Sequence, residues 1–181
     1  MKKLNLGSGQ DYREGYINVD NNTNYKADVI HDLNVYPYPF NEDEFEKIDA
    51  FHIIEHLDNP LLFLQELYRI SKNDVEIIIK CPHFSGNWIH PMHKSAISTK
   101  LFDFLDKNNP EYYGNVNFEI KKIVLKWVGH TDLGKRKNPI IKFLNIIIGF
   151  LANLNIAFTE RLWCYWVGGF EEIIFEVKVK K

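Results

Sequence analysis

Cysteine is scarce in this sequence. The two that occur, Cys81 and Cys164, lie far apart and form no Cys-x-x-Cys pair. Disulfide frameworks and zinc knuckles need closely spaced cysteines, so we expect neither, and a reducing cytoplasm is the compartment that fits. The chain runs straight into a strand-like segment, so we also expect no signal peptide.

Long apolar runs and a strong charge imbalance are missing as well. The longest nearly apolar stretch, residues 143–151, is interrupted by Asn145 and falls short of the roughly 20 residues that cross a bilayer. The net charge of −2 lacks the basic excess typical of nucleic-acid-binding proteins, so we expect no nucleic acid partner. The 181 residues, 45% of them hydrophobic and 25% charged, are typical of one globular domain.

What the chain does have is a series of short runs rich in Ile and Val and mostly apolar on both faces, as parallel strands covered by helices are. These runs are residues 3–7, 16–20, 27–32, 47–53 and 75–81. Only residues 8–15 separate the first two runs, whereas a crossover helix takes a dozen or more residues. We therefore expect a turn there, and a thin cover on one side of the loop.

Helices are predicted between and after these runs. Residues 58–70 are amphipathic, with Asp58 or Asn59 as the cap and Pro60 in the first turn. Residues 71–74 are predicted to turn into the next strand, and a second helix to start near Ser98 and end by Pro110.

The C-terminal part completes the predicted architecture. Residues 118–128 and 172–179 alternate in hydrophobicity, as half-buried antiparallel strands do. The chain is thus predicted to be a single α/β domain over residues 1–181, with a doubly wound, mainly parallel sheet and an antiparallel C-terminal strand. Residues 3–106 would form the ligand-binding core, and residues 107–181 the sheet edge and an apolar helix.

The motif that indicates function is Gly7-Ser8-Gly9 at the end of the first run, with Asp20 thirteen residues after Gly7. Two glycines let the backbone approach a ligand, and an acid at the end of the second strand can accept from ribose hydroxyls. A dinucleotide site has a third glycine three positions after the second, where this chain has Tyr12. The acidic residue of a dinucleotide site also comes about twenty residues on, later than Asp20 does here. The spacing favours S-adenosylmethionine. A tight strand-to-turn junction is the alternative for the two glycines.

Five segments in order resemble class I S-adenosylmethionine-dependent methyltransferases, most closely the small type 11 group. They are Leu4–Gly9, Gly15–Asp20, Ala27–Asn34, Tyr38–Phe40 and His52–Leu57. The resemblance covers about residues 3–106 and implies a Rossmann-like methyltransferase fold with S-adenosylmethionine as cofactor. By the same resemblance Leu6, Gly7, Ser8 and Gly9 pass under the methionine part, Asp20 binds the ribose, Asp32 and Leu33 flank the adenine, and His52 lines the methyl-bearing end. A turn cap is the alternative for Asp32.

Histidines gather where two predicted strands end. His52 lies at the end of the fourth run and His56 follows it, and His83 follows the fifth, with His90 and His93 in the loop beyond. The carboxyl ends of parallel strands form one edge of the sheet, where a near-neutral imidazole can act as a general base. We predict catalytic roles for His52, His83 and His93. Structural packing is the alternative for His56 and for His93, which also matches the His-Lys of a loop in families that this chain resembles.

We expect no bound metal. Some methyltransferases of this fold bind magnesium through an acid-x-x-Glu-His sequence, but here His52 replaces the first acid. The weak candidates are His52, Glu55, His56 and His83, with a softer ion than magnesium.

The helix predicted over residues 139–154 is apolar nearly all round, with Lys142, Asn145, Gly149 and Asn153 in one stripe. Such a helix is buried, or it lies against a partner or a membrane surface. The cluster Lys135–Lys137 precedes it, so a peripheral membrane contact through residues 135–154 is one alternative, and a solvated loop before a core helix is the other. Trp163, Tyr165, Trp166 and Phe170 are expected in the core or on the wall of an acceptor pocket.

The function predicted is methyl transfer from S-adenosylmethionine to a small-molecule or glycan-related acceptor. One alternative is a non-catalytic subunit that binds S-adenosylmethionine and serves as a partner or scaffold. The other is a nicotinamide-dependent oxidoreductase, which a full helix directly after Gly9 would support.

Overall fold

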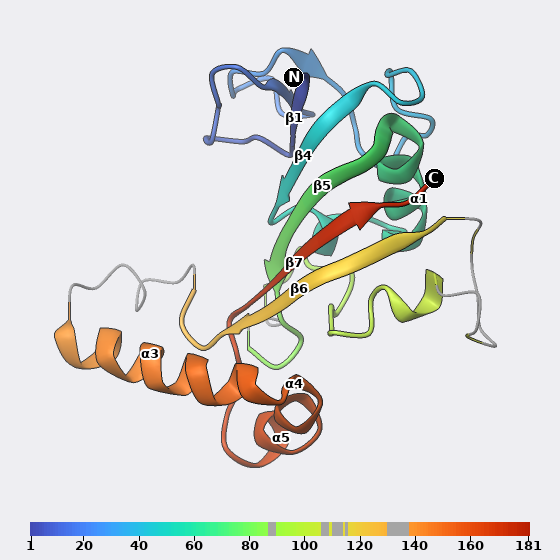
Figure 1. Ribbon diagram of the computed structural model, residues 1–181. Helices are drawn as coiled ribbons and strands as arrows, with labels where there is room; N and C mark the ends of the chain where they lie inside the picture. Colours follow the sequence, from blue (N-terminus) through green and yellow to red (C-terminus); the bar gives the residue numbers. More distant parts are fainter. Residues whose placement is uncertain (87–89, 106–108, 110–113, 115, 130–137) are drawn as a thin grey trace.

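The computed structural model describes residues 1–86, 90–105, 109, 114, 116–129 and 138–181, so the cluster Lys135–Lys137 lies outside the described residues. Within them, seven strands form one sheet in the order β3-β2-β1-β4-β5-β7-β6 (Figure 1). The strands are β1 (Lys3–Leu6), β2 (Ile17–Asp20), β3 (Val29–Ile30), β4 (Phe45–Phe51), β5 (Ser71–Pro82), β6 (Phe118–Lys126) and β7 (Glu172–Val179). The first five are parallel, and β7 is antiparallel to β5 and β6. The chain winds outward from β1 in both directions, which confirms the predicted doubly wound sheet.

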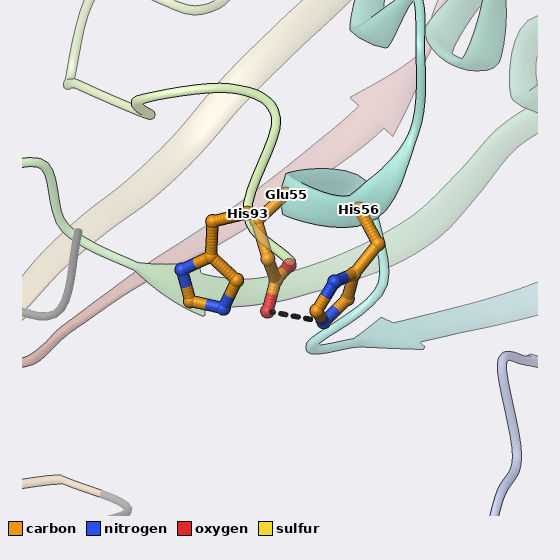
Figure 2. Close-up of side chains that lie close together, drawn as sticks. All are labelled: Glu55, His56 and His93. Atoms are coloured by element: carbon orange, nitrogen blue, oxygen red, sulfur yellow. Dashed lines mark ion pairs between the residues drawn. The ribbon is translucent and has the colours of Figure 1, made fainter. Parts of the chain in front are cut away.

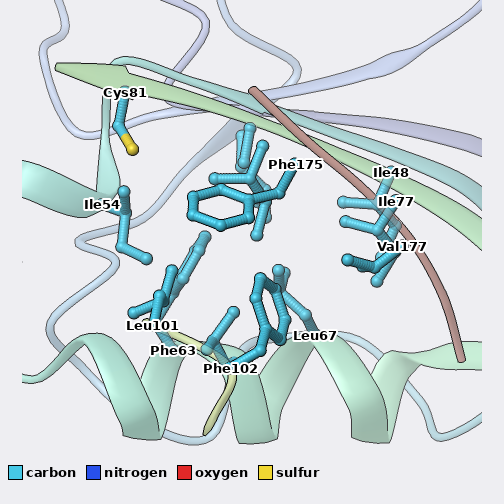
Figure 3. Close-up of a cluster of buried hydrophobic side chains, with 14 of the residues drawn as sticks. Ile48, Ile54, Phe63, Leu67, Ile77, Cys81, Leu101, Phe102, Phe175 and Val177 are labelled. Atoms are coloured by element: carbon cyan, nitrogen blue, oxygen red, sulfur yellow. The ribbon is translucent and has the colours of Figure 1, made fainter. Parts of the chain in front are cut away.

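The core lies on one face of this sheet, under α1 (Pro60–Ile70). Rows of aligned residues such as Ile48, Ile77 and Val177 cross neighbouring strands and meet Phe63 and Leu67 of the helix (Figure 3). The helix begins where the sequence predicts, because the Asn59 side chain accepts hydrogen bonds from the amides of Leu61 and Leu62, both at 3.0 Å.

The opposite face is polar and is covered near β1 by a loop instead of a helix. Residues 7–16 contain only turns, as predicted. Arg13 spans this loop: its guanidinium donates to Asp49 Oδ2 at 2.7 Å and stacks 4.4 Å from the Phe51 ring. Asn18 Oδ1 accepts a hydrogen bond from the Arg13 amide at 2.9 Å, and Asn18 Nδ2 donates one to Asp28 Oδ2 at 2.9 Å. Side-chain hydrogen bonds thus hold the short crossover in place.

Two predicted elements need correction. Residues 71–74, predicted as a turn, begin β5, because Ser71 pairs with Phe45 before the register shifts. The helix predicted from Ser98 is, in the part described, turns and one short 3-10 helix, η2 (Asp103–Leu105). The chain before η2 is held by other bonds, since Ile97 forms a bridge with His83 and the Thr99 amide donates to Glu160 at 2.8 Å.

The C-terminal helical segment lies beyond the carboxyl ends of the central strands (Figure 1). It comprises α3 (Pro139–Leu154), α4 (Ile156–Phe158), η3 (Thr159–Trp163) and α5 (Cys164–Trp166). Only Ala152 of α3 is buried, which rules out a core helix. Of the four aromatic residues expected in the core, Phe170 is buried and Trp163 is half-buried, but Tyr165 and Trp166 are exposed.

No single helix among the described residues is long and apolar enough to cross a membrane. One consecutive pair, α3 and residues 156–166, reaches that length and composition together, but the pair is bent by 103°.

We expect Phe63→Ala to destabilise the protein by about 3–5 kcal/mol, because its fully buried ring would leave a cavity between α1 and the sheet. Urea unfolding followed by circular dichroism measures the loss. Leu62→Ala, one residue along α1 and 41% exposed, is the matched control and should lose far less. Equal losses in the two variants would contradict the observed packing.

Candidate functional site

The turn after β1 is shaped by its first glycine. Gly7 has a φ of +66°, and a Cβ added there would come within 2.8 Å of the Ile53 side chain. Only glycine combines this left-handed conformation with so close an approach. Ser8 is buried, and its amide donates to the Val19 carbonyl at 2.9 Å, which ties the turn to β2.

Asp20, at the end of β2, points at this turn. Its Oδ2 accepts a hydrogen bond from the Gly9 amide at 2.7 Å, and its Oδ1 accepts one from the Asn22 amide at 2.8 Å. The side chain therefore bridges the β1 turn and the segment that follows β2.

A cavity of about 720 Å³ opens beside these groups. Of the predicted cofactor residues, Gly7, Asp20, Asp32 and Leu33 line it. Asp32 also accepts from the Asn34 amide at 2.9 Å, so it caps a turn and faces the cavity at once. The wall also contains residues that sequence reasoning missed: Asn21, Asn22, Tyr25, His31, Asn34, Ile53, Leu57, His90 and Met92. Asn21 and Asn22 follow β2, His31 follows β3, and Ile53 comes two residues after β4. That position at a strand end is the signal that could have found these four.

Gly7 also lines a second hollow, of about 620 Å³. Ser8 and His52 line it together with Glu172, Lys80 and Phe51. Gly7 is common to the walls of both hollows, whereas His52 lines only the second.

His52 directly follows β4 in a left-handed conformation, with a φ of +53°, and is held between two acids. Its Nε2 lies 3.2 Å from Glu172 Oε1, and its Nδ1 lies 3.6 Å from Glu55 Oε1. Burial alone would lower the pKa of His52, but the hydrogen bonds to these carboxylates outweigh it and raise the pKa to about 9. Burial would raise the pKa of Glu172, but His52 and Lys126 lower it to about 2. His52 is therefore an imidazolium at neutral pH.

Glu55, His56 and His93 lie close together (Figure 2), and His56 lines the first cavity. One donor atom from each falls within 4.8 Å of the others, and Glu55 is only 1% exposed. His56 Nδ1 lies 3.1 Å from the Met92 carbonyl, so it carries the proton and leaves Nε2 facing Glu55 Oε1 at 3.9 Å. Two imidazoles and a carboxylate are a donor set that Zn²⁺ accepts. Of the weak metal candidates named from the sequence, Glu55 and His56 belong to this cluster, whereas His52 and His83 do not, and His93 is the third member.

His83 lies outside both hollows. It is fully buried, with Nε2 at 3.1 Å from Glu160 Oε1 and Nδ1 at 2.7 Å from Ser85 Oγ. Its predicted catalytic role finds no support in this position, because both nitrogens are bonded within the protein.

Solved structures share this architecture along nearly the whole chain. A SAM-dependent methyltransferase from Archaeoglobus fulgidus has a TM-score of 0.57 at 20% identity, over 98% of this chain and 85% of that one. Coclaurine N-methyltransferase, bound to N-methylheliamine and SAH, has a TM-score of 0.55 at 12% identity, over 98% and 67%. The chain has the class I methyltransferase fold.

A protein described as a cyclase also has this fold. The [4+2]-cyclase SpnF has a TM-score of 0.58 at 11% identity, over 99% of this chain and 75% of its own. No family model matches the chain, and no curated protein matches it in sequence. The methyltransferase fold accounts for the position of the cavity, because ligands of open α/β sheets bind at the carboxyl ends of the strands where the strand order reverses.

We expect the pKa of His52 to fall from about 9 to a clearly lower value in Glu172→Gln. Burial lowers this pKa, and in the variant only one carboxylate, Glu55, is left to raise it. Two-dimensional NMR titration of the imidazole measures it. Glu76→Gln, an exposed carboxylate on β5, is the control and should leave the pKa unchanged. An unchanged pKa in Glu172→Gln would contradict the pairing.

The stability that the pair contributes follows from the same shifts. The contribution from His52 is complete below its unfolded pKa of 6.5 and is lost as the pH rises through about 9. The contribution from Glu172 is complete above 4.5 and is lost as the pH falls through about 2. The destabilisation by Glu172→Gln should therefore be greatest between pH 4.5 and 6.5.

We expect the purified, metal-free protein to bind about one Zn²⁺ per chain, since the Glu55 cluster offers three ligand atoms close together. Calorimetric titration should show binding at least about tenfold weaker in His56→Ala and in His93→Ala. His31→Ala, on another part of the cavity wall, is the control. Zn²⁺ binding that survives both cluster variants would refute the assignment.

Proposed function

We propose that this chain binds S-adenosylmethionine in the cavity beside Gly7 and transfers its methyl group to a small-molecule or glycan-related acceptor. The observation that carries the proposal is the 2.7 Å hydrogen bond from the Gly9 amide to Asp20 on the wall of the 720 Å³ cavity. This bond sets a bare glycine turn and an acid side by side, as adenosyl ligands need.

The residues present fit that cofactor. A carboxylate offers about four acceptor positions, and Asp20 uses two of them for backbone amides. The remaining acceptor positions of Asp20 can accept hydrogen bonds from the two ribose hydroxyls. Asp32, on the same wall, can accept from the exocyclic amine of the adenine beside Leu33. The cavity volume lies within the range of about 300–1,000 Å³ typical of small-molecule sites.

The bound cofactor supplies a reactive methyl group on its sulfonium, and the protein has to align and dehydrate the acceptor. An imidazolium at His52 cannot accept a proton, so His52 is not the general base. We assign His52 a structural role, in which its ion pair with Glu172 fixes the end of β4. On the acceptor side we assign His93, which packs against His56 with ring centroids 4.9 Å apart and so positions that imidazole at the cavity wall.

The two alternatives fare differently. SpnF, described as a cyclase, illustrates that this fold also supports other chemistry, so a subunit that binds the cofactor without methyl transfer is retained as the second candidate. Methyl turnover on any acceptor would exclude it. The nicotinamide alternative loses its main support, because residues 10–16 form no helix.

We expect S-adenosylhomocysteine to bind the wild-type protein, and Asp20→Ala to weaken that binding by about 10- to 100-fold through loss of charge-assisted hydrogen bonds to the ribose. Isothermal titration calorimetry measures both affinities.

Asp103→Ala is the matched control, since that carboxylate lies outside the cavity and pairs with Lys100. Thermal unfolding of each variant verifies that the fold is intact. An affinity that is the same in Asp20→Ala and wild type would remove Asp20 from the site. No binding by the wild type would overturn the proposed function.

A further inference from the structure

The helix α3 presents its apolar side to solvent. Ile140, Phe143, Ile146, Phe150 and Leu154 are all exposed, and Phe150 reaches 65%. In Figure 1, α3 lies along the end of the sheet and extends past it, away from the core. A helix of a globular domain normally turns this side inward, so the orientation needs a cause.

The cause is a pair of asparagines on the opposite side. Asn145 accepts from the Val128 amide and donates to the Val128 carbonyl, both at 3.1 Å. Asn153 makes the same two contacts with the backbone of Leu125, at 2.9 and 2.8 Å. Four hydrogen bonds thus attach the polar stripe of α3 to β6 and the residues that follow it. The apolar side faces outward because the polar side is used within the protein.

Exposed apolar side chains also occur past the bend after α3. Phe158, Leu162, Tyr165 and Val167 are exposed, and Trp166 is 84% exposed. We call the exposed apolar residues between Ile140 and Val167 the α3–α5 surface. Large apolar side chains exposed in such number within one segment mark an interaction site, since single exposed apolar residues are normal but many in one segment are not.

The charges around this surface indicate its partner. Residues 138–168 contain three charged side chains, and the acid among them, Glu160, is buried against His83 and Thr99. The exposed ones, Lys142 and Arg161, are both positive. In the sequence, Lys135–Lys137 come directly before. Two copies packed through this surface would bring like charges together, whereas an anionic lipid surface would attract them.

We propose that the α3–α5 surface docks on an anionic lipid bilayer. Phe150 and its apolar neighbours enter the boundary between headgroups and acyl chains, Trp166 and Tyr165 lie at headgroup level, and Lys142 and Arg161 meet the lipid phosphates. Glu160 joins this segment to His83, directly after β5, so docking holds the carboxyl edge of the sheet, where the cavity lies, next to the bilayer. The docking itself does not depend on the proposed function.

Co-sedimentation of the full chain with vesicles tests this. We expect binding to phosphatidylcholine vesicles containing phosphatidylglycerol, and weaker binding to pure phosphatidylcholine. Phe150→Glu and Trp166→Glu should each weaken binding at least about tenfold, as expected when a large apolar side chain no longer leaves water. Leu62→Glu, an exposed apolar residue of α1, is the matched control and should bind as the wild type does.

Lys142→Glu combined with Arg161→Glu separates the charge contribution. This double variant should bind the anionic vesicles more weakly than the wild type does, and its binding to the neutral vesicles should be little changed. Circular dichroism verifies the fold of each variant. Equal binding to the two vesicle compositions would overturn the anionic preference. No vesicle binding, together with a dimer in sedimentation velocity that Phe150→Glu dissociates, would assign the surface to a second copy and overturn the proposal.

Discussion

Asp20 accepts a hydrogen bond from the Gly9 amide at 2.7 Å, and through it the end of β2 closes on the turn after β1. The turn is fixed from two more sides, since Ser8 donates to Val19 and Gly7 leaves no room beside Ile53. A backbone held at these points cannot collapse into the space above the sheet. The bond therefore holds in place the turn that forms one side of the cavity, and residues later in the chain complete its wall.

The short crossover between β1 and β2 imposes a second constraint. A helix there would satisfy its own backbone and cover the polar face of the sheet. Here Asn18 binds the loop backbone, Asp28 accepts hydrogen bonds from the Asn18 amide and side chain, and Arg13 closes over Asp49. The Asp49 side chain is nearly inaccessible, so loss of Arg13 would leave a buried charge without its counter-ion. A few polar side chains thus replace a helix, and the turn they support is the one that forms the cavity.

Sequence reasoning succeeded where the determinant is local. Asn59-Pro60 and Asn138-Pro139 both start helices where the sequence predicts, because cap and proline act within one turn. It failed where the determinant is a distant partner. The helix expected from Ser98 is absent in the described residues, where Thr99 binds Glu160 at a separation of 61 residues.

The same distinction applies to the histidines. Their positions at strand ends follow from the sequence, but the acid that charges His52 comes from β7, 120 residues away. No periodicity encodes such a pair. The outward orientation of α3 was likewise left open by the sequence. Asn145 and Asn153 mark its polar stripe, yet only the fold places β6 against them.

The C-terminal segment is more than an appendage to the cofactor-binding part of the fold. Glu172 reaches His52 at the end of β4, and Glu160 reaches His83 at the end of β5. Both acids are buried, so separating either from its histidine would leave a polar group without its partner in a poorly hydrated place. The segment that holds the α3–α5 surface is therefore fixed to the carboxyl edge of the sheet. A contact made through that surface sets the orientation of the edge, because the two histidine–carboxylate pairs leave little freedom between them.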